Sequence, residues 1–217
     1  MSNPDSFIDE VSEEVRRDRL YGYLRRYGWI AVLIVIGIVG GAAWREWSAA
    51  QETERARAFG TAVLEALEAE TPAARAADLA AIEAPEGSAA AILAMLRAAE
   101  QAAAEDADPA VVAETLNAVG DMQAEAVYRQ IASYKALTRE GVSAEERRIG
   151  FEAMAQGGPL QLMAEEQLAL LDIEAGDTEA AIERLQTIRQ DSAASQGLRL
   201  RASQLIVALG GSIEDGA

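Results

Sequence analysis

Residues 168–185 read LALLDIEAGDTEAAIERL, and this stretch sets the pattern of the C-terminal part of the chain. Apolar residues recur every three or four positions on both sides of Gly176, which predicts two helices joined by a tight turn. Small residues at Ala169 and Ala181 allow these helices to approach closely. Large apolar side chains then fill the space between them: Leu168, Ile182 and Leu185.

The turn of this unit recurs along the chain. Gly141, Gly176 and Gly210 lie 35 and 34 residues apart, and another turn at residues 106–109 precedes them by a similar interval. A period of about 34 residues is typical of a helix-turn-helix repeat, and residues 168–185 resemble the tetratricopeptide (TPR) pattern. The earlier units match less well, since Glu146 stands where the clearest unit has Ala181.

Strong helix formers dominate from Gln51 onward, and Gly or Pro residues separate them into about eight or nine helices. Ser143 and Glu146 have the spacing of a capping box, and Thr178 is the expected cap of the helix that carries Ala181. Residues 45–70 predict a long helix with Trp47, Ala50, Phe59, Val63 and Leu67 on one broad face. The expected fold class is all-α: one N-terminal transmembrane helix followed by a TPR-like α-solenoid of stacked helix pairs.

The transmembrane helix is predicted from an uncharged run. Residues 27–44 read YGWIAVLIVIGIVGGAAW. At about 1.5 Å per residue they span roughly 27 Å, close to the thickness of a bilayer's hydrocarbon core. Tyr27 and Trp29 lie at one edge and Trp44 and Trp47 at the other, where aromatic rings favour the headgroup layer. The expected domains are a tail at 1–26, a transmembrane helix at 27–47 and a helical domain at 48–217.

Arginines close to the span indicate its orientation. Five precede it and three follow it within a short distance, which favours a cytoplasmic N-terminus and an exported C-terminal domain. The alternative is a cleaved signal peptide, since Gly41 and Ala43 form a small-x-small site before Trp44. The long, acid-containing tail argues against cleavage, because signal peptides are short and basic there. Within the tail, a short amphipathic helix is expected from the spacing of Phe7, Ile8, Val11 and Val15.

Composition excludes several functions. The 217 residues include 36 acids, 19 bases, no histidine and no cysteine, for a formal net charge of −17. Nucleic acid is an unfavourable partner, since phosphate binding needs a basic surface. Without cysteine the chain can form no disulfide and perform no thiol chemistry. Without histidine it lacks the side chain that most often serves as a general base or a zinc ligand. Carboxylates alone can hydrolyse glycosides, but no pair is marked: Glu165-Glu166 and Glu145-Glu146 are expected on solvated helix faces. We expect no enzyme, cofactor, metal site or small-molecule substrate.

The whole chain resembles a known family. A charged tail, one span, the exit GGAAWREW and an acidic helical domain are similar to the YfgM-like family, ancillary subunits of the SecYEG translocon. The resemblance is strongest over residues 7–17, 27–29 and 44–47. It implies a single-pass protein of the bacterial inner membrane with a periplasmic TPR-like domain. It also implies association with the translocon and with a membrane-anchored periplasmic chaperone of the prolyl-isomerase class, and a non-enzymatic role in assisting newly exported polypeptides.

A partner-binding surface follows from the repeat register. If the first helix of each repeat lines the concave face, exposed positions come from two units: Tyr128, Ile131 and Lys135 in one, and Met163, Glu166 and Leu170 in the next. Packing of these side chains between neighbouring helices is the alternative. A different function for the same scaffold also stays open: an assembly or structural accessory factor of a respiratory or cell-division complex.

Overall fold

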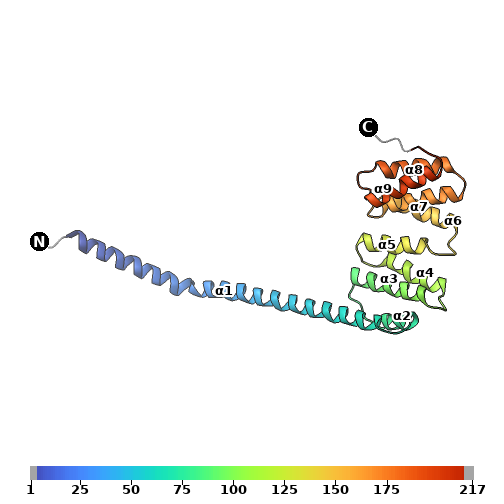
Figure 1. Ribbon diagram of the computed structural model, residues 1–217. Helices are drawn as coiled ribbons and strands as arrows, with labels where there is room; N and C mark the ends of the chain where they lie inside the picture. Colours follow the sequence, from blue (N-terminus) through green and yellow to red (C-terminus); the bar gives the residue numbers. More distant parts are fainter. Residues whose placement is uncertain (1–3, 213–217) are drawn as a thin grey trace. The chain divides into compact units, whose positions relative to one another are not determined.

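A computed structural model describes the backbone of residues 4–212 and the side chains of residues 25–30 and 32–212. Within that range the secondary structure is entirely helical, which confirms the expected all-α class (Figure 1). The elements in chain order are α1 (Pro4–Leu67), α2 (Pro72–Ala80), α3 (Ser88–Ala103), α4 (Pro109–Ala118), η1 (Val119–Asp121), α5 (Ala126–Leu137), α6 (Ala144–Ala155), α7 (Gln161–Glu174), α8 (Thr178–Gln190) and α9 (Gln196–Ala208).

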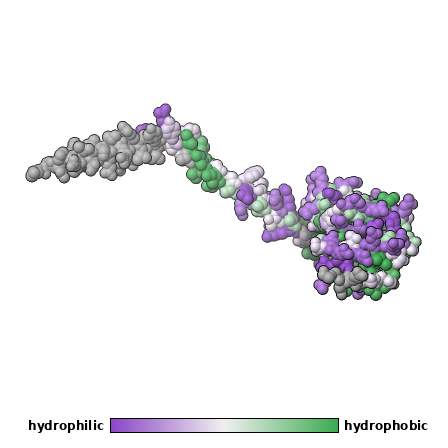
Figure 2. Space-filling model, turned by 90° about the horizontal axis from the view of Figure 1, so that it is seen from above, coloured by the Kyte–Doolittle hydropathy of each residue, from purple (hydrophilic) through white to green (hydrophobic). Residues whose placement is uncertain are grey.

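The chain forms two compact units, residues 1–58 and 59–217. The first unit is helical from Pro4 and consists of the larger part of α1, which is, among the described residues, the one helix long and apolar enough to cross a bilayer. The large apolar side chains described between Tyr27 and Trp47 are exposed, and those of the uncharged run form the hydrophobic band along α1 in Figure 2. The rings of Trp44 and Trp47 lie 5.4 Å apart, both exposed. The amphipathic face expected for residues 7–15 lies outside the described side chains.

Helices α2–α9 in the second unit pack in chain order, each against the next, to form a stack (Figure 1). Four apolar clusters follow one another along it. The first joins the end of α1 to α2 and α3, and the last joins α7, α8 and α9. The long helix predicted for residues 45–70 is present as far as Leu67. On its predicted broad face Phe59, Val63 and Leu67 pack in the first cluster, whereas Trp47 and Ala50 are exposed.

Short polar side chains begin several of these helices. Ser143 accepts a hydrogen bond from the backbone N–H of Glu146, which confirms the predicted cap of α6. Asp177 accepts one from the N–H of Ala180, so Asp177 is the cap of α8 and the prediction of Thr178 was wrong by one residue. A carboxylate at this position accepts as well as a hydroxyl does, which is why both residues fit the pattern.

Helices α7 and α9 end in the same way. Gly176 and Gly210 have φ values of 81° and 82°, in the left-handed region that glycine adopts without strain. In both turns the next residue donates its N–H to a carbonyl five residues back, from Asp177 to Asp172 and from Gly211 to Ile206. These are Schellman caps. The 34-residue spacing of the two glycines therefore reflects two helix ends of the same geometry.

Close packing of α7 and α8 depends on the small residues singled out from the sequence. Ala169 and Ala181 are fully buried, as is Leu185, and Leu168 is 1 % exposed. The large side chains of Leu185 and Ile188 pack against Ala169 in the cluster that extends to α9. The predicted contact between the two helices of this unit is confirmed.

Candidate binding groove between helices α7 and α9

A groove of about 480 Å³ lies between α7 and α9. Its residues recur every three or four positions on each helix, so each helix presents one face to it. The lining combines apolar, amide and charged groups: Leu170, Leu205 and Ala208; Gln167 and Gln204; Glu166 and Arg201. Ligand sites likewise combine apolar surface with a few polar groups, so this groove is a candidate binding site.

An ion pair between α7 and α9 forms part of the groove lining. Arg201 of α9 donates from Nε and Nη2 to the two carboxylate oxygens of Glu166 of α7, at 2.7 and 2.8 Å. Glu166 is only 6 % exposed, whereas the guanidinium side faces solvent. The hydrogen bonds and the charge of Glu166 raise the pKa of Arg201. Because both oxygens are occupied in a bidentate pair, Glu166 joins the two helices and is not a free carboxylate.

The same face of α7 also contacts α5. Gln167 donates its side-chain N–H to the Tyr134 hydroxyl oxygen at 2.9 Å. Burial, and then the negative charge of Glu166, raise the pKa of Tyr134, so the phenol stays protonated at neutral pH. The ring centroids of Tyr134 and Phe151 lie 5.6 Å apart in an edge-to-face arrangement. Helices α5, α7 and α9 are therefore connected by side-chain hydrogen bonds through Gln167 and Glu166.

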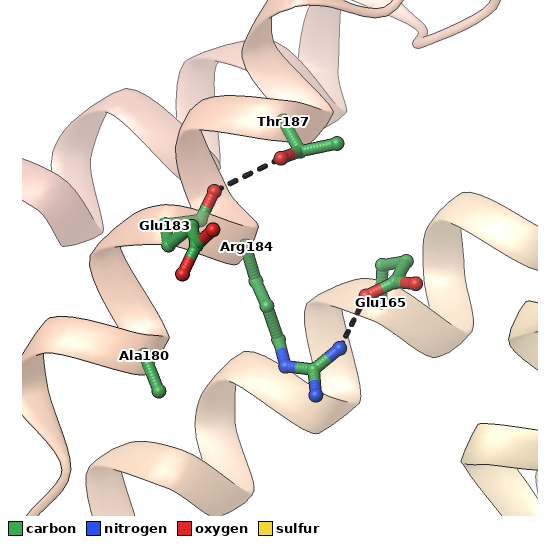
Figure 3. A pocket seen from close by; sticks show the side chains of 5 residues that line it. All are labelled: Glu165, Ala180, Glu183, Arg184 and Thr187. Atoms are coloured by element: carbon green, nitrogen blue, oxygen red, sulfur yellow. Dashed lines mark hydrogen bonds and ion pairs between the residues drawn. The ribbon is translucent and has the colours of Figure 1, made fainter.

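A second polar cluster lies between α7 and α8, beside a pocket of about 330 Å³ (Figure 3). Arg184 binds Glu165 and Asp172, both at 2.9 Å, and Arg148 of α6 binds the other oxygen of Asp172 at 2.8 Å. Burial opposes the charge of Arg184, but the hydrogen bonds to Glu165 and Asp172 outweigh burial and raise its pKa. The cluster holds three helices together, and Asp172 is 4 % exposed at its centre.

The structure corrects the expected position of two acidic residues. Glu165 and Glu166 were predicted on a solvated face, but both are paired with arginines of other helices, and Glu166 is buried. Glu145 and Glu146 are exposed in the first turn of α6, as expected. Periodicity could not separate these two pairs of glutamates, because the arginines that bind Glu165 and Glu166 lie 19 and 35 residues farther along the chain.

The six predicted binding residues divide into three groups. Leu170 and Glu166 line the groove, although the expectation that Glu166 is exposed was wrong. Lys135 is exposed on α5. Tyr128 packs against the core of α3, α4 and α5, while Ile131 and Met163 are half-buried. The structure therefore brings only two of the six together in one groove.

The α9 half of the groove was missed from the sequence. One signal could have found it: adding the 34-residue period to Leu170 leads to Gln204, a lining residue. No group of three or more potential metal ligands occurs among the residues whose side chains are described. Comparison with protein families, with curated proteins and with solved structures finds no match to this chain.

Proposed function

We propose that the protein is a membrane-anchored, non-enzymatic TPR-like scaffold that binds polypeptide segments in the groove between α7 and α9. The observation that carries this proposal is the groove itself, in a chain that also has an apolar helix able to span a bilayer. Within this proposal α5, α7 and α9 are first helices of successive repeats and face the concave side. The matched Schellman caps of α7 and α9, 34 residues apart, support that assignment.

The groove has the chemistry to hold an extended chain. Leu170, Leu205 and Ala208 offer apolar contact to a side chain. Gln167 and Gln204 carry amides that can both donate and accept hydrogen bonds, as a peptide backbone requires. Such contacts recognise the backbone and the apolar side chains of a bound peptide more than they recognise a defined sequence. This suits newly exported polypeptides, and the proposed partners are the SecYEG translocon and a membrane-anchored periplasmic prolyl-isomerase-type chaperone.

The groove can be tested by site-specific crosslinking in cells. A photoreactive residue at Ala208, which lines the groove and is exposed, is expected to capture translocon subunits, the chaperone or exported chains. Val111 of α4 is also exposed and lies outside the groove, so the same photoreactive residue there is the matched control. Equal capture from both positions would contradict a role for the groove. Capture of respiratory or cell-division subunits from Ala208 would assign the scaffold to the alternative function.

The proposed topology places the N-terminus in the cytoplasm and residues 48–217 in the periplasm of a bacterial inner membrane. It rests on the excess of arginines before the span. An alkaline phosphatase fused after Ala217, which folds only after export, is expected to be active. Digestion of spheroplasts with protease should then remove the C-terminal domain. Protection of that domain would overturn the topology, and a released fragment that starts at Trp44 would indicate signal-peptide cleavage.

A further inference from the structure

One face of α9 is left uncovered by the described part of the chain. Leu200 and Val207 are 58 % and 57 % exposed, and Gln204 between them is exposed as well. Their spacing of four and three residues places all three on one face of the helix. Two large apolar side chains on one exposed helix face indicate a contact that the described fold does not supply.

The repeat register shows what kind of contact this face makes. Thirty-four residues earlier, the equivalent positions on α7 are Glu166, Leu170 and Ile173. Glu166 binds Arg201 of α9 and Leu170 lines the groove against α9, so on α7 this face receives the next helix. Among the described residues no helix follows α9 to cover its equivalent face.

The distribution of charge favours a second copy of the chain at this face. Two molecules with a net charge of −17 repel one another wherever their acids meet. Residues 192–213 contain no Asp or Glu, and only residues 19–45, around the span, form a longer stretch without acids. Within residues 192–213 the charges are Arg199 and Arg201. A contact between two copies at α9, or between their apolar helices, therefore brings together no acidic side chains of these two stretches.

We propose that two copies pair through antiparallel contact of their α9 helices about a two-fold axis at Gln204. In this arrangement Leu200 packs against the partner's Val207, and the reverse contact is identical, as two-fold symmetry requires. The two Gln204 amides donate to and accept from each other on the axis.

The span supports the same occupant independently. Gly37 and Gly41 lie four residues apart on α1, the GxxxG spacing at which transmembrane helices pair closely. The α9 contact alone is small beside the roughly 1,200 Å² of a stable interface. Anchoring both copies in one membrane raises their effective concentration, so a small contact suffices. The pairing is accordingly expected in membranes and not in the diluted protein.

Because the chain has no cysteine, single-cysteine variants of the full chain in native membranes test the geometry directly. Gln204→Cys is expected to give a disulfide-linked homodimer under mild oxidation. Leu200→Cys and Val207→Cys should each fail alone, since their sulfurs sit about 12 and 9 Å from their symmetry mates, beyond disulfide range. Coexpression of these two variants should restore the linkage. Val111→Cys, exposed on α4, measures random collision.

Each other outcome overturns the proposal. Crosslinking of Leu200→Cys alone indicates parallel packing, and equal yields at Val111→Cys indicate collision. If Gln204→Cys forms no homodimer, or forms a disulfide with another protein instead, a second copy of the chain does not bind this face. Adding Leu200→Arg to Gln204→Cys should abolish the homodimer. Leu200→Arg by itself should leave capture of other proteins from Ala208 unchanged, since Leu200 does not line the groove. Failure of the pairing and failure of the proposed groove are therefore distinguishable.

Discussion

Replacing Ala181 by arginine is expected to lower the free energy of unfolding of the helical stack by about 3–5 kcal/mol, the range for an uncompensated buried charge. Ala181 is fully buried where α8 packs on α7. An arginine there must either force the helices apart or leave its charge unpaired in the apolar cluster beside Leu185 and Ile188. Urea unfolding of the full chain in mild detergent, followed by circular dichroism, measures the loss.

Ala153→Arg is the matched control for this experiment. Ala153 lies within α6 and is exposed, so the same substitution adds the same charge without a steric cost. Its unfolding midpoint should stay close to that of the unchanged protein. If Ala181→Arg were as stable as Ala153→Arg, the contact between α7 and α8 that defines the clearest repeat would be wrong.

The second large effect is expected from Asp172→Asn. Asp172 is 4 % exposed and receives both Arg148 and Arg184, at 2.8 and 2.9 Å, so one carboxylate joins α6, α7 and α8. An asparagine keeps the size but not the charge, and it turns one amide N–H toward an arginine. The two arginines are about a third exposed, so solvent offsets part of the penalty. We expect a loss of about 2–3 kcal/mol in the same urea titration.

Glu174→Gln provides the comparison, because Glu174 also pairs with an arginine of α6. Its ion pair with Arg147 is short, at 2.6 Å, but the Glu174 side chain is 52 % exposed. Exposed pairs contribute little to stability, so this variant should unfold almost as the unchanged protein does. Equal losses at Asp172 and Glu174 would show that burial of the carboxylate is not what makes the three-helix connection strong.

Several features of the fold could be predicted because they depend on neighbours in sequence. The apolar run at residues 27–44, the glycine turns and the small residues at Ala169 and Ala181 each act over a few residues or between two adjacent helices. The structure confirms the all-helical class, the span-length apolar helix and the burial of both alanines. Local chemistry also set the cap of α6 at Ser143.

The binding surface could not be predicted in this way, because it depends on which distant side chains meet. Glu165 and Glu166 look alike in sequence, yet Arg184 and Arg201 reach them from two other helices and bury the second. The sequence by itself thus determined the helices, the apolar helix of membrane-spanning length and the close contact of one helix pair. The tertiary structure decided that Glu166 supports the groove wall, that Tyr128 belongs to a core, and that Leu200 and Val207 remain exposed. The reason is physical: helix periodicity assigns a residue to a face, and only packing between helices decides what that face meets.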